Sequence, residues 1–192
     1  MQKLFEHDYS FNGKHATYIK YLTKTGKEDK DDPLMPSSKA GIFERYIDVY
    51  MNAAVFGLLY DRREEREPGS DRARIYADAF IGERENCLFL YRLVMLLDTS
   101  TSLTDEERVN RAFRYDSDPN KEELQKENVE LFNSYVRGGI EIIYELFTEN
   151  CISKEDYIER IEKVTSTFQN ELNGESYQQK LTDLINNEAN SI

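Results

Sequence analysis

Three long apolar segments, separated by polar turns, dominate the pattern of the chain. They cover about residues 40–66, 71–98 and 121–148. In each segment apolar residues recur at steps of three and four, which is the spacing of a helix that buries one face. No stretch shows convincing strand alternation. The pattern therefore predicts an all-α fold, a single-domain helical bundle of about six or seven helices, three of them long.

The first long segment is apolar around most of its circumference, which favours a central position covered on several sides. Its small residues Ala53, Ala54 and Gly57 would let another helix come close. In the third segment, Gly138 and Gly139 each destabilise a helix interior by about 1 kcal/mol relative to alanine. We therefore expect tight packing, a local kink, or a ligand approaching the backbone at this glycine pair.

Shorter helices are expected where turn and capping residues precede an apolar repeat. They cover about residues 13–25, 104–115 and 153–172, with a last helix before a polar C-terminal tail. Thr104 and Glu107 have the spacing of a capping box. Residues 26–38 combine mixed charges with two prolines, which indicates a mobile loop. Gly82 interrupts the second long segment and predicts a close approach or a slight kink.

The 192 residues carry a net charge of −12, which changes the set of expected partners. Most of the acidic excess falls in residues 117–192. Because phosphate contacts need clustered Lys and Arg, direct general binding of nucleic acid is not expected. We interpret the acidic surface first as a solvated face that keeps the protein soluble, and second as a surface that attracts a basic protein partner, with a homo-oligomer as an alternative.

The chain shows no signal for a membrane or an oxidising compartment. No stretch approaches 18 uncharged apolar residues, and the N-terminus lacks the apolar run of a signal peptide. Its two cysteines, Cys87 and Cys151, stand far apart, so we interpret them as structural thiols. These features predict a cytoplasmic protein.

Common catalytic motifs are absent from the sequence. It contains no phosphate-binding loop, no dinucleotide fingerprint and no nucleophile elbow. Only two histidines are present, so a histidine-based metal centre is not expected. We expect no cofactor, and we assign no catalytic residue and no metal ligand.

Helical carboxylates are the only abundant candidates for a magnesium site. Glu123, Glu127 and Glu130 share one helix face, and Glu141 and Glu145 share another. Helical nucleotide pyrophosphohydrolases hold magnesium with this spacing. Exposed helices also carry it, paired with Lys and Arg, and we favour that second interpretation.

Two arginines are the strongest candidates for a buried ion pair or an anion-binding pocket. Arg92 interrupts the apolar run LFLYRLVMLL, where a charge must be paired or lead to a polar pocket. The long helices offer Asp48, Asp61 and Glu141 as partners. Arg137, next to the glycine pair, is the second candidate, since arginine stays charged when partly buried.

Three functional hypotheses follow, since no motif points to a characterised family. The first is a non-enzymatic accessory or regulatory protein that acts through protein–protein interaction. The second is a magnesium-dependent nucleotide or phosphate-ester hydrolase, with Arg92 or Arg137 near the phosphates. The third is a nucleic-acid-associated component of a bacterial defence or DNA-processing complex, acting through the arginine-rich middle of the chain.

Overall fold

The protein is mostly helical, as the sequence predicts. A computed structural model describes residues 4–24, 41–116, 118–149, 151 and 154–173. Its helices are α1 (Gly13–Leu22), α2 (Tyr46–Leu59), α3 (Ala77–Gly82), α4 (Arg84–Leu97), α5 (Asp105–Phe113), α6 (Glu122–Thr148) and α7 (Lys154–Asn173). A 3₁₀ turn (Pro119–Lys121) precedes α6. Over these residues, no helix has the length and apolarity to cross a membrane.

Two compact units divide the chain, Met1–Glu145 and Leu146–Ile192. The second contains α7, whose Tyr157 and Val164 are buried. The Tyr157 hydroxyl donates to the Cys151 carbonyl at 3.4 Å. The expectation of one domain over 1–192 stays a prediction. The loop at 26–38, the last helix and the C-terminal tail lie outside the described residues.

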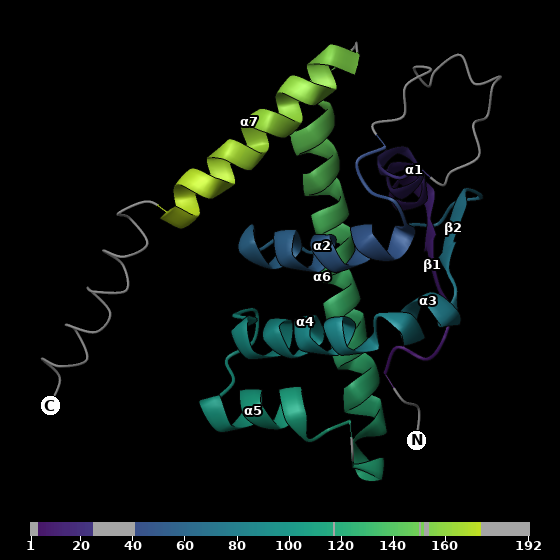
Figure 1. The fold of residues 1–192 in the computed structure, drawn as a ribbon. Coiled ribbons are helices and arrows are strands. Elements are labelled where there is room, and N and C mark those ends of the chain that lie inside the picture. The colour runs from purple at the N-terminus through teal and green to yellow at the C-terminus, as the bar shows by residue number, and fades with distance from the viewer. Residues whose placement is uncertain (1–3, 25–40, 117, 150, 152–153, 174–192) are drawn as a thin grey trace, which may run out of the picture. The chain divides into compact units, whose positions relative to one another are not determined.

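Within the first unit, α6 is the central helix of the core. Helices α2, α4 and α5 lie side by side and cross α6, as Figure 1 shows. The α6 side chains that face them are buried: Phe132, Tyr135, Val136, Ile140 and Ile143. Successive members of this set are one, three or four residues apart, so the predicted apolar stripe is the stripe that the fold buries.

Glycines let α2 and α6 touch through their backbones. A Cβ atom at Gly57 would overlap the carbonyl oxygen of Tyr135, and one at Gly139 would overlap that of Ala53. A Cβ at Gly138 would overlap the carbonyl oxygen of Arg62. The predicted close packing at these small residues is therefore confirmed. Protein backbone, not a ligand, fills the space beside the glycine pair.

The first long helix is shorter than the expected range of 40–66. It starts at Tyr46 because the carboxylate of Asp48 accepts a hydrogen bond from the Arg45 backbone N–H at 2.9 Å. Before it, Phe43 pairs with the end of α1, and its N–H donates to the Leu22 carbonyl at 3.0 Å.

A C-terminal cap ends the same helix at Leu59. The Arg62 N–H donates to the Gly57 carbonyl at 2.9 Å, and the Asp61 N–H to that of Leu58 at 3.2 Å. Asp61 has a φ of +48°, the left-handed conformation of this motif. Residues 62–67, called the crossing segment below, then leave the helix and run across α6, where the Glu64 N–H donates to the Ser134 carbonyl.

The expected long helix at 71–98 divides into a strand and two helices. Strand β2 (Arg72–Ile75) pairs antiparallel with β1 (Tyr9–Asn12), and Tyr9 lies opposite Ile75. The sequence did not predict these strands, since four residues are too few to show an alternation. Gly82 ends α3, and among the described residues no atom beyond its chain neighbours and its own helix backbone lies within 4 Å of the position that a Cβ would take there. Gly82 therefore marks a break and not a close approach.

Candidate functional site

Arg92 lies in none of the ion pairs that the sequence suggested. Its guanidinium is 3.9 Å from the carboxylate of Asp116, which follows α5, and its side chain is 38% exposed. The same group lies over the ring of Phe113, 5.2 Å from the centroid. Its Nε atom is buried and has no hydrogen-bond partner among the described residues. Arg92 therefore joins α4 to α5 and to the residues directly after it. It does not form the ion pair with Asp48, Asp61 or Glu141 that the sequence suggested.

Arg137 is a buried structural arginine that fixes the crossing segment to α6. Its Nε donates to the Glu64 carbonyl at 2.7 Å, and one terminal nitrogen donates to the Tyr9 hydroxyl at 2.9 Å. The other donates to Glu130 at 2.7 Å. Glu130 also pairs with Arg66 at 2.8 Å. All three guanidinium nitrogens of Arg137 are thus engaged by the protein itself.

Glu141 is a buried carboxylate that meets three cationic or proton-donating side chains. One oxygen lies 2.8 Å from the Lys14 amine and 2.9 Å from His15 Nε2, and the other pairs with Arg62. The side chains of His15 and Glu141 are 1% and 5% exposed. Because an ionised carboxylate only accepts hydrogen bonds, Nε2 of His15 is the donor.

The pKa values of Lys14 and His15, the two neighbours of Glu141 on α1, shift in opposite directions. The hydrogen bond to Glu141 raises the pKa of Lys14. Burial lowers the pKa of His15 and outweighs the opposing attraction of Glu141. A neutral His15 that donates to an ionised Glu141 satisfies both groups. The cluster therefore joins α1, the crossing segment and α6 and needs no bound ligand.

The remaining two candidates have local roles at helix ends. Asp48 caps α2 and pairs with the side chain of Arg45 at 2.6 Å, and Arg45 also reaches Glu83 at 2.8 Å. Asp61 lies in the C-terminal cap, and its carboxylate is 3.4 Å from the Tyr135 hydroxyl. The structure therefore distributes the five predicted site residues over separate contacts and does not bring them into one pocket.

A second buried ion pair, Asp98 with Arg111, was not predicted from the sequence. Arg111 donates to Asp98 at 3.2 Å and to the Met95 carbonyl at the end of α4. The Tyr135 hydroxyl donates to Asp98 at 2.7 Å. Burial alone would raise the pKa of Asp98, but hydrogen bonds from Ser100, Tyr135 and Arg111 hold it below its usual value. The position of Asp98 directly after an apolar helix is the one sequence feature that could have indicated this buried ion pair.

Four of the helical carboxylates suggested for magnesium, Glu123, Glu130, Glu141 and Glu145, pair with cations. Glu123 pairs with Lys126 at 2.9 Å, and Glu145 accepts from Arg62 at 2.8 and 2.9 Å. Across the described ranges, no three His, Cys, Asp or Glu side chains form a group that could hold a metal ion. The exposed, paired Glu123 and Glu145 match the solvated face that we favour, whereas Glu141 is paired but buried.

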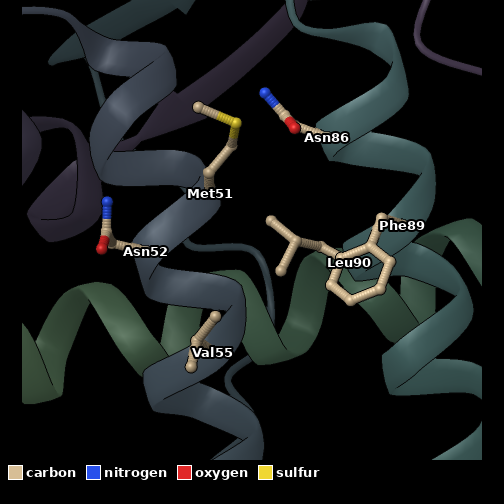
Figure 2. A pocket seen from close by; sticks show the side chains of 6 residues that line it. All are labelled: Met51, Asn52, Val55, Asn86, Phe89 and Leu90. Carbon is tan, nitrogen blue, oxygen red and sulfur yellow. The ribbon is translucent and has the colours of Figure 1, made fainter.

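An apolar groove between α2 and α4 is the surface that stands out instead. Figure 2 shows the side chains that gather around it. They are Met51, Asn52 and Val55 of α2 and Asn86, Phe89 and Leu90 of α4, and they border an open, shallow space of about 290 Å³. Phe89 is 65% exposed. A phenyl ring with this exposure gains little of the roughly 1.5–3 kcal/mol of stabilisation that its full burial would provide.

Further exposed apolar side chains lie on turns next to the groove. Leu59 follows Val55 by one turn of α2 and is also 65% exposed. On α4, Arg92 follows Phe89 by one turn and covers the ring of Phe113, itself exposed. Exposed apolar side chains that lie beside a groove are found at protein interaction sites.

Comparisons with protein-family models, with curated proteins and with solved structures find no match to this chain.

Proposed function

We propose that this protein is a non-enzymatic accessory protein that binds an amphipathic helix of a partner protein in the groove between α2 and α4. The observation that carries the proposal is the exposure of Phe89 beside a groove between two neighbouring helices. A helix lying in an apolar groove is a common mode of recognition, with anchors at every third or fourth residue. Phe89 and Leu59 would bury their exposed side chains against these anchors.

The charge of the protein selects the kind of helix. Glu85 lies one turn before Phe89 on α4 and is exposed. The carboxylates of Asp48, near the start of α2, and of Glu83, just before α4, are joined by Arg45. Lysine or arginine at the matching end of the partner would complement these acids. The net charge of −12 would also speed the encounter with a basic partner.

A pair of synthetic helices tests this proposal. The first carries leucine at every third or fourth position and lysine on its flanks, and the second has glutamate in place of lysine. We expect saturable binding of the lysine peptide in calorimetry and at least about tenfold weaker binding of the glutamate peptide. Equal affinity for both peptides would show that charge does not select the partner.

A substitution in the groove distinguishes specific binding of the peptide there from nonspecific binding to other apolar side chains. Phe89→Asp should weaken binding of the lysine peptide by about tenfold or more, because it places a charge against apolar anchors. Ile81→Asp is the matched control, since Ile81 is 58% exposed on α3 and does not line the groove. If both variants bind like the original protein, the groove is not the site. A dimer that Phe89→Asp dissociates would instead identify a second copy as the occupant.

Contacts among the described residues do not favour the hydrolase or the nucleic-acid hypothesis over this one. The arginines Arg62 and Arg66 of the crossing segment are paired with Glu141, Glu145 and Glu130. Both hypotheses stay predictions from the sequence.

A further inference from the structure

A second cavity lies where the N-terminal segment passes over the first half of α6. It encloses about 370 Å³, within the range of roughly 300–1,000 Å³ that is usual for small-molecule sites. Its walls come from residues 4–9, from α2, α3 and α6, and from Arg66 of the crossing segment. It shares no lining residue with the groove between α2 and α4.

Aromatic rings form the walls of this cavity. Phe80 lies 5.1 Å from Tyr50 and 5.9 Å from Phe5, measured between ring centroids. Tyr9 lies 5.9 Å from Tyr50. Phe5 has a φ of +60°, a left-handed conformation that a bulky residue adopts at a cost of about 1–2 kcal/mol. Such walls favour a flat aromatic ligand, because rings gain from stacked and edge-to-face contacts.

An unpartnered amide lies in the same lining. Gln125 is 6% exposed, and its Nε2 group is buried without a hydrogen-bond acceptor among the described residues. A buried donor left without a partner destabilises a protein by about 1–3 kcal/mol. An acceptor on a bound molecule, such as a carbonyl oxygen or a carboxylate, would remove that penalty.

A cationic side chain, Arg66, lines the mouth of the cavity. It lies over the Tyr9 ring at 5.6 Å and uses Nε and one terminal nitrogen to contact Glu130. Guanidinium has five donors, so Arg66 can contact Glu130 and an added anion together. Glu130 is neutralised in turn by the buried Arg137. In a protein of net charge −12, this mouth can accept a single negative charge.

We propose that the cavity binds a small planar aromatic acid, with its ring against Phe5 and Tyr9, which are the partly exposed rings of the lining. One acceptor of the ligand takes the hydrogen bond from Gln125, and its anionic group meets Arg66. This site is independent of the helix groove and adds a small-molecule ligand to the proposed protein partner.

Indole-3-carboxylate is a suitable probe, since it is planar, anionic and fluorescent. The chain contains no tryptophan, so the fluorescence anisotropy of the probe reports its binding directly. Neutral indole and cyclohexanecarboxylate are the comparison probes. We expect saturable binding of indole-3-carboxylate at millimolar concentration or below and weaker binding of both others. If none of the three binds saturably at millimolar concentration, the proposal is wrong.

Gln125→Leu separates a ligand-binding role from a structural one. It removes the unpartnered donor at similar size, so it should leave the free energy of unfolding unchanged or higher while weakening probe binding at least about tenfold. Asn128→Leu, on the same helix outside the lining, is the matched control and should change affinity by less than about twofold. Wild-type affinity in Gln125→Leu would overturn the assignment.

Arg66→Ala tests the recognition of charge. It should reduce the preference for indole-3-carboxylate over neutral indole and leave the affinity for indole itself close to that of the original protein. Phe89→Asp, in the helix groove, should leave probe binding unchanged, so failure of one proposal is distinguishable from failure of the other. An unchanged preference in Arg66→Ala would contradict the anionic part of the proposal.

Discussion

At the scale of single residues, the buried polar groups are fixed by contacts with residues far away in the sequence. Glu141 meets His15, 126 positions earlier, and Arg137 meets Tyr9, 128 positions earlier. Buried charges of this kind are strongly destabilising when one partner is removed, because the other keeps its charge without compensation. The His15 and Arg137 clusters therefore give the clearest predictions for stability.

The burial of His15 predicts a loss of stability in mild acid. Burial lowers the folded-state pKa of His15 below its ordinary 6.5, so the unfolded chain binds a proton that the folded protein resists. The stability is complete above about pH 6.5 and falls as the pH drops toward the folded-state pKa. Chemical unfolding at several pH values should show this slope, and His15→Gln should flatten it.

His7→Gln is the matched control for that measurement, because His7 is exposed and is the other histidine of the chain. It should leave the slope unchanged. A slope that persists in His15→Gln would show that other groups cause the acid sensitivity.

Arg137→Lys should be far more destabilising than Arg92→Lys. The planar guanidinium of Arg137 donates to three groups at once, which a lysine amine cannot reproduce in the same geometry. We expect a loss of about 3 kcal/mol in the free energy of unfolding at Arg137. At Arg92, which is partly exposed and 3.9 Å from its partner, we expect less than about 1 kcal/mol. Similar losses at both positions would contradict these assignments.

At the scale of elements, the backbone contact between α2 and α6 determines where glycine is needed. Helix propensity alone favours alanine over glycine at every helical position. Packing reverses that preference at Gly57 and Gly139, where a Cβ would overlap a carbonyl oxygen of the other helix. The same substitution thus has opposite effects at different glycines of one protein.

Gly57→Ala and Gly139→Ala should each lower the free energy of unfolding by more than about 2 kcal/mol, since overpacking shifts backbone against backbone. Gly82→Ala adds an atom with no described neighbour within 4 Å beyond its chain neighbours and its own helix backbone, so it should be neutral or stabilising by up to about 1 kcal/mol. Thermal or denaturant unfolding of the three variants measures the difference. A stabilising Gly139→Ala would show that the helices do not cross as closely as described.

The cap at the end of α2 gives a second prediction at this scale. Asp61 holds a left-handed conformation that glycine adopts without strain. Asp61→Gly should therefore preserve or raise stability by up to about 1 kcal/mol, whereas Asp61→Val should lower it, because a β-branched residue resists a positive φ. If both variants destabilised equally, the Asp61 contact with Tyr135 would matter more than the cap.

At the scale of the whole molecule, the excess of negative charge opposes folding. The net charge of −12 makes the compact state repel itself, and salt weakens that repulsion. The buried pairs at Asp98, Glu141 and Arg137 are screened little, and exposed pairs contribute about 1 kcal/mol or less each. Relief of repulsion should therefore be the larger effect of salt.

Raising the salt concentration from about 0.01 M to about 0.15 M should increase the free energy of unfolding. Sodium chloride and potassium chloride should act alike, because the effect is one of screening and not of a specific ion. A steady loss of stability over this range would mean that surface ion pairs outweigh the net repulsion.

The sequence alone determined the helical class, α6, the capping box of α5 and the close approach at the small residues. Thr104 and Glu107 form the cap that their spacing predicts, with the Glu107 N–H donating to Thr104 at 3.3 Å. These features are local, since a helix and its caps are set by hydrogen bonds between residues three or four apart. A periodic pattern of apolar residues records them directly.

Tertiary structure decided the strands, the crossing segment and the partners of every buried charge described above. Strand β2 exists because β1, near the start of the chain, supplies its hydrogen bonds, with Asn12 opposite Arg72. No pattern within the four residues RARI shows this pairing. A strand depends on a distant partner for its hydrogen bonds, whereas a helix makes its own.

The same dependence on distant partners explains why the contacts of the candidate site residues could not be predicted from the sequence. In the fold, Arg92 contacts Asp116 and Phe113, and Glu141 contacts Lys14, His15 and Arg62. The exposure of Phe89 and the unpartnered amide of Gln125 likewise follow from what packs against each residue. An interaction between residues far apart depends on how the helices pack, and the order of residues along the chain does not record that packing.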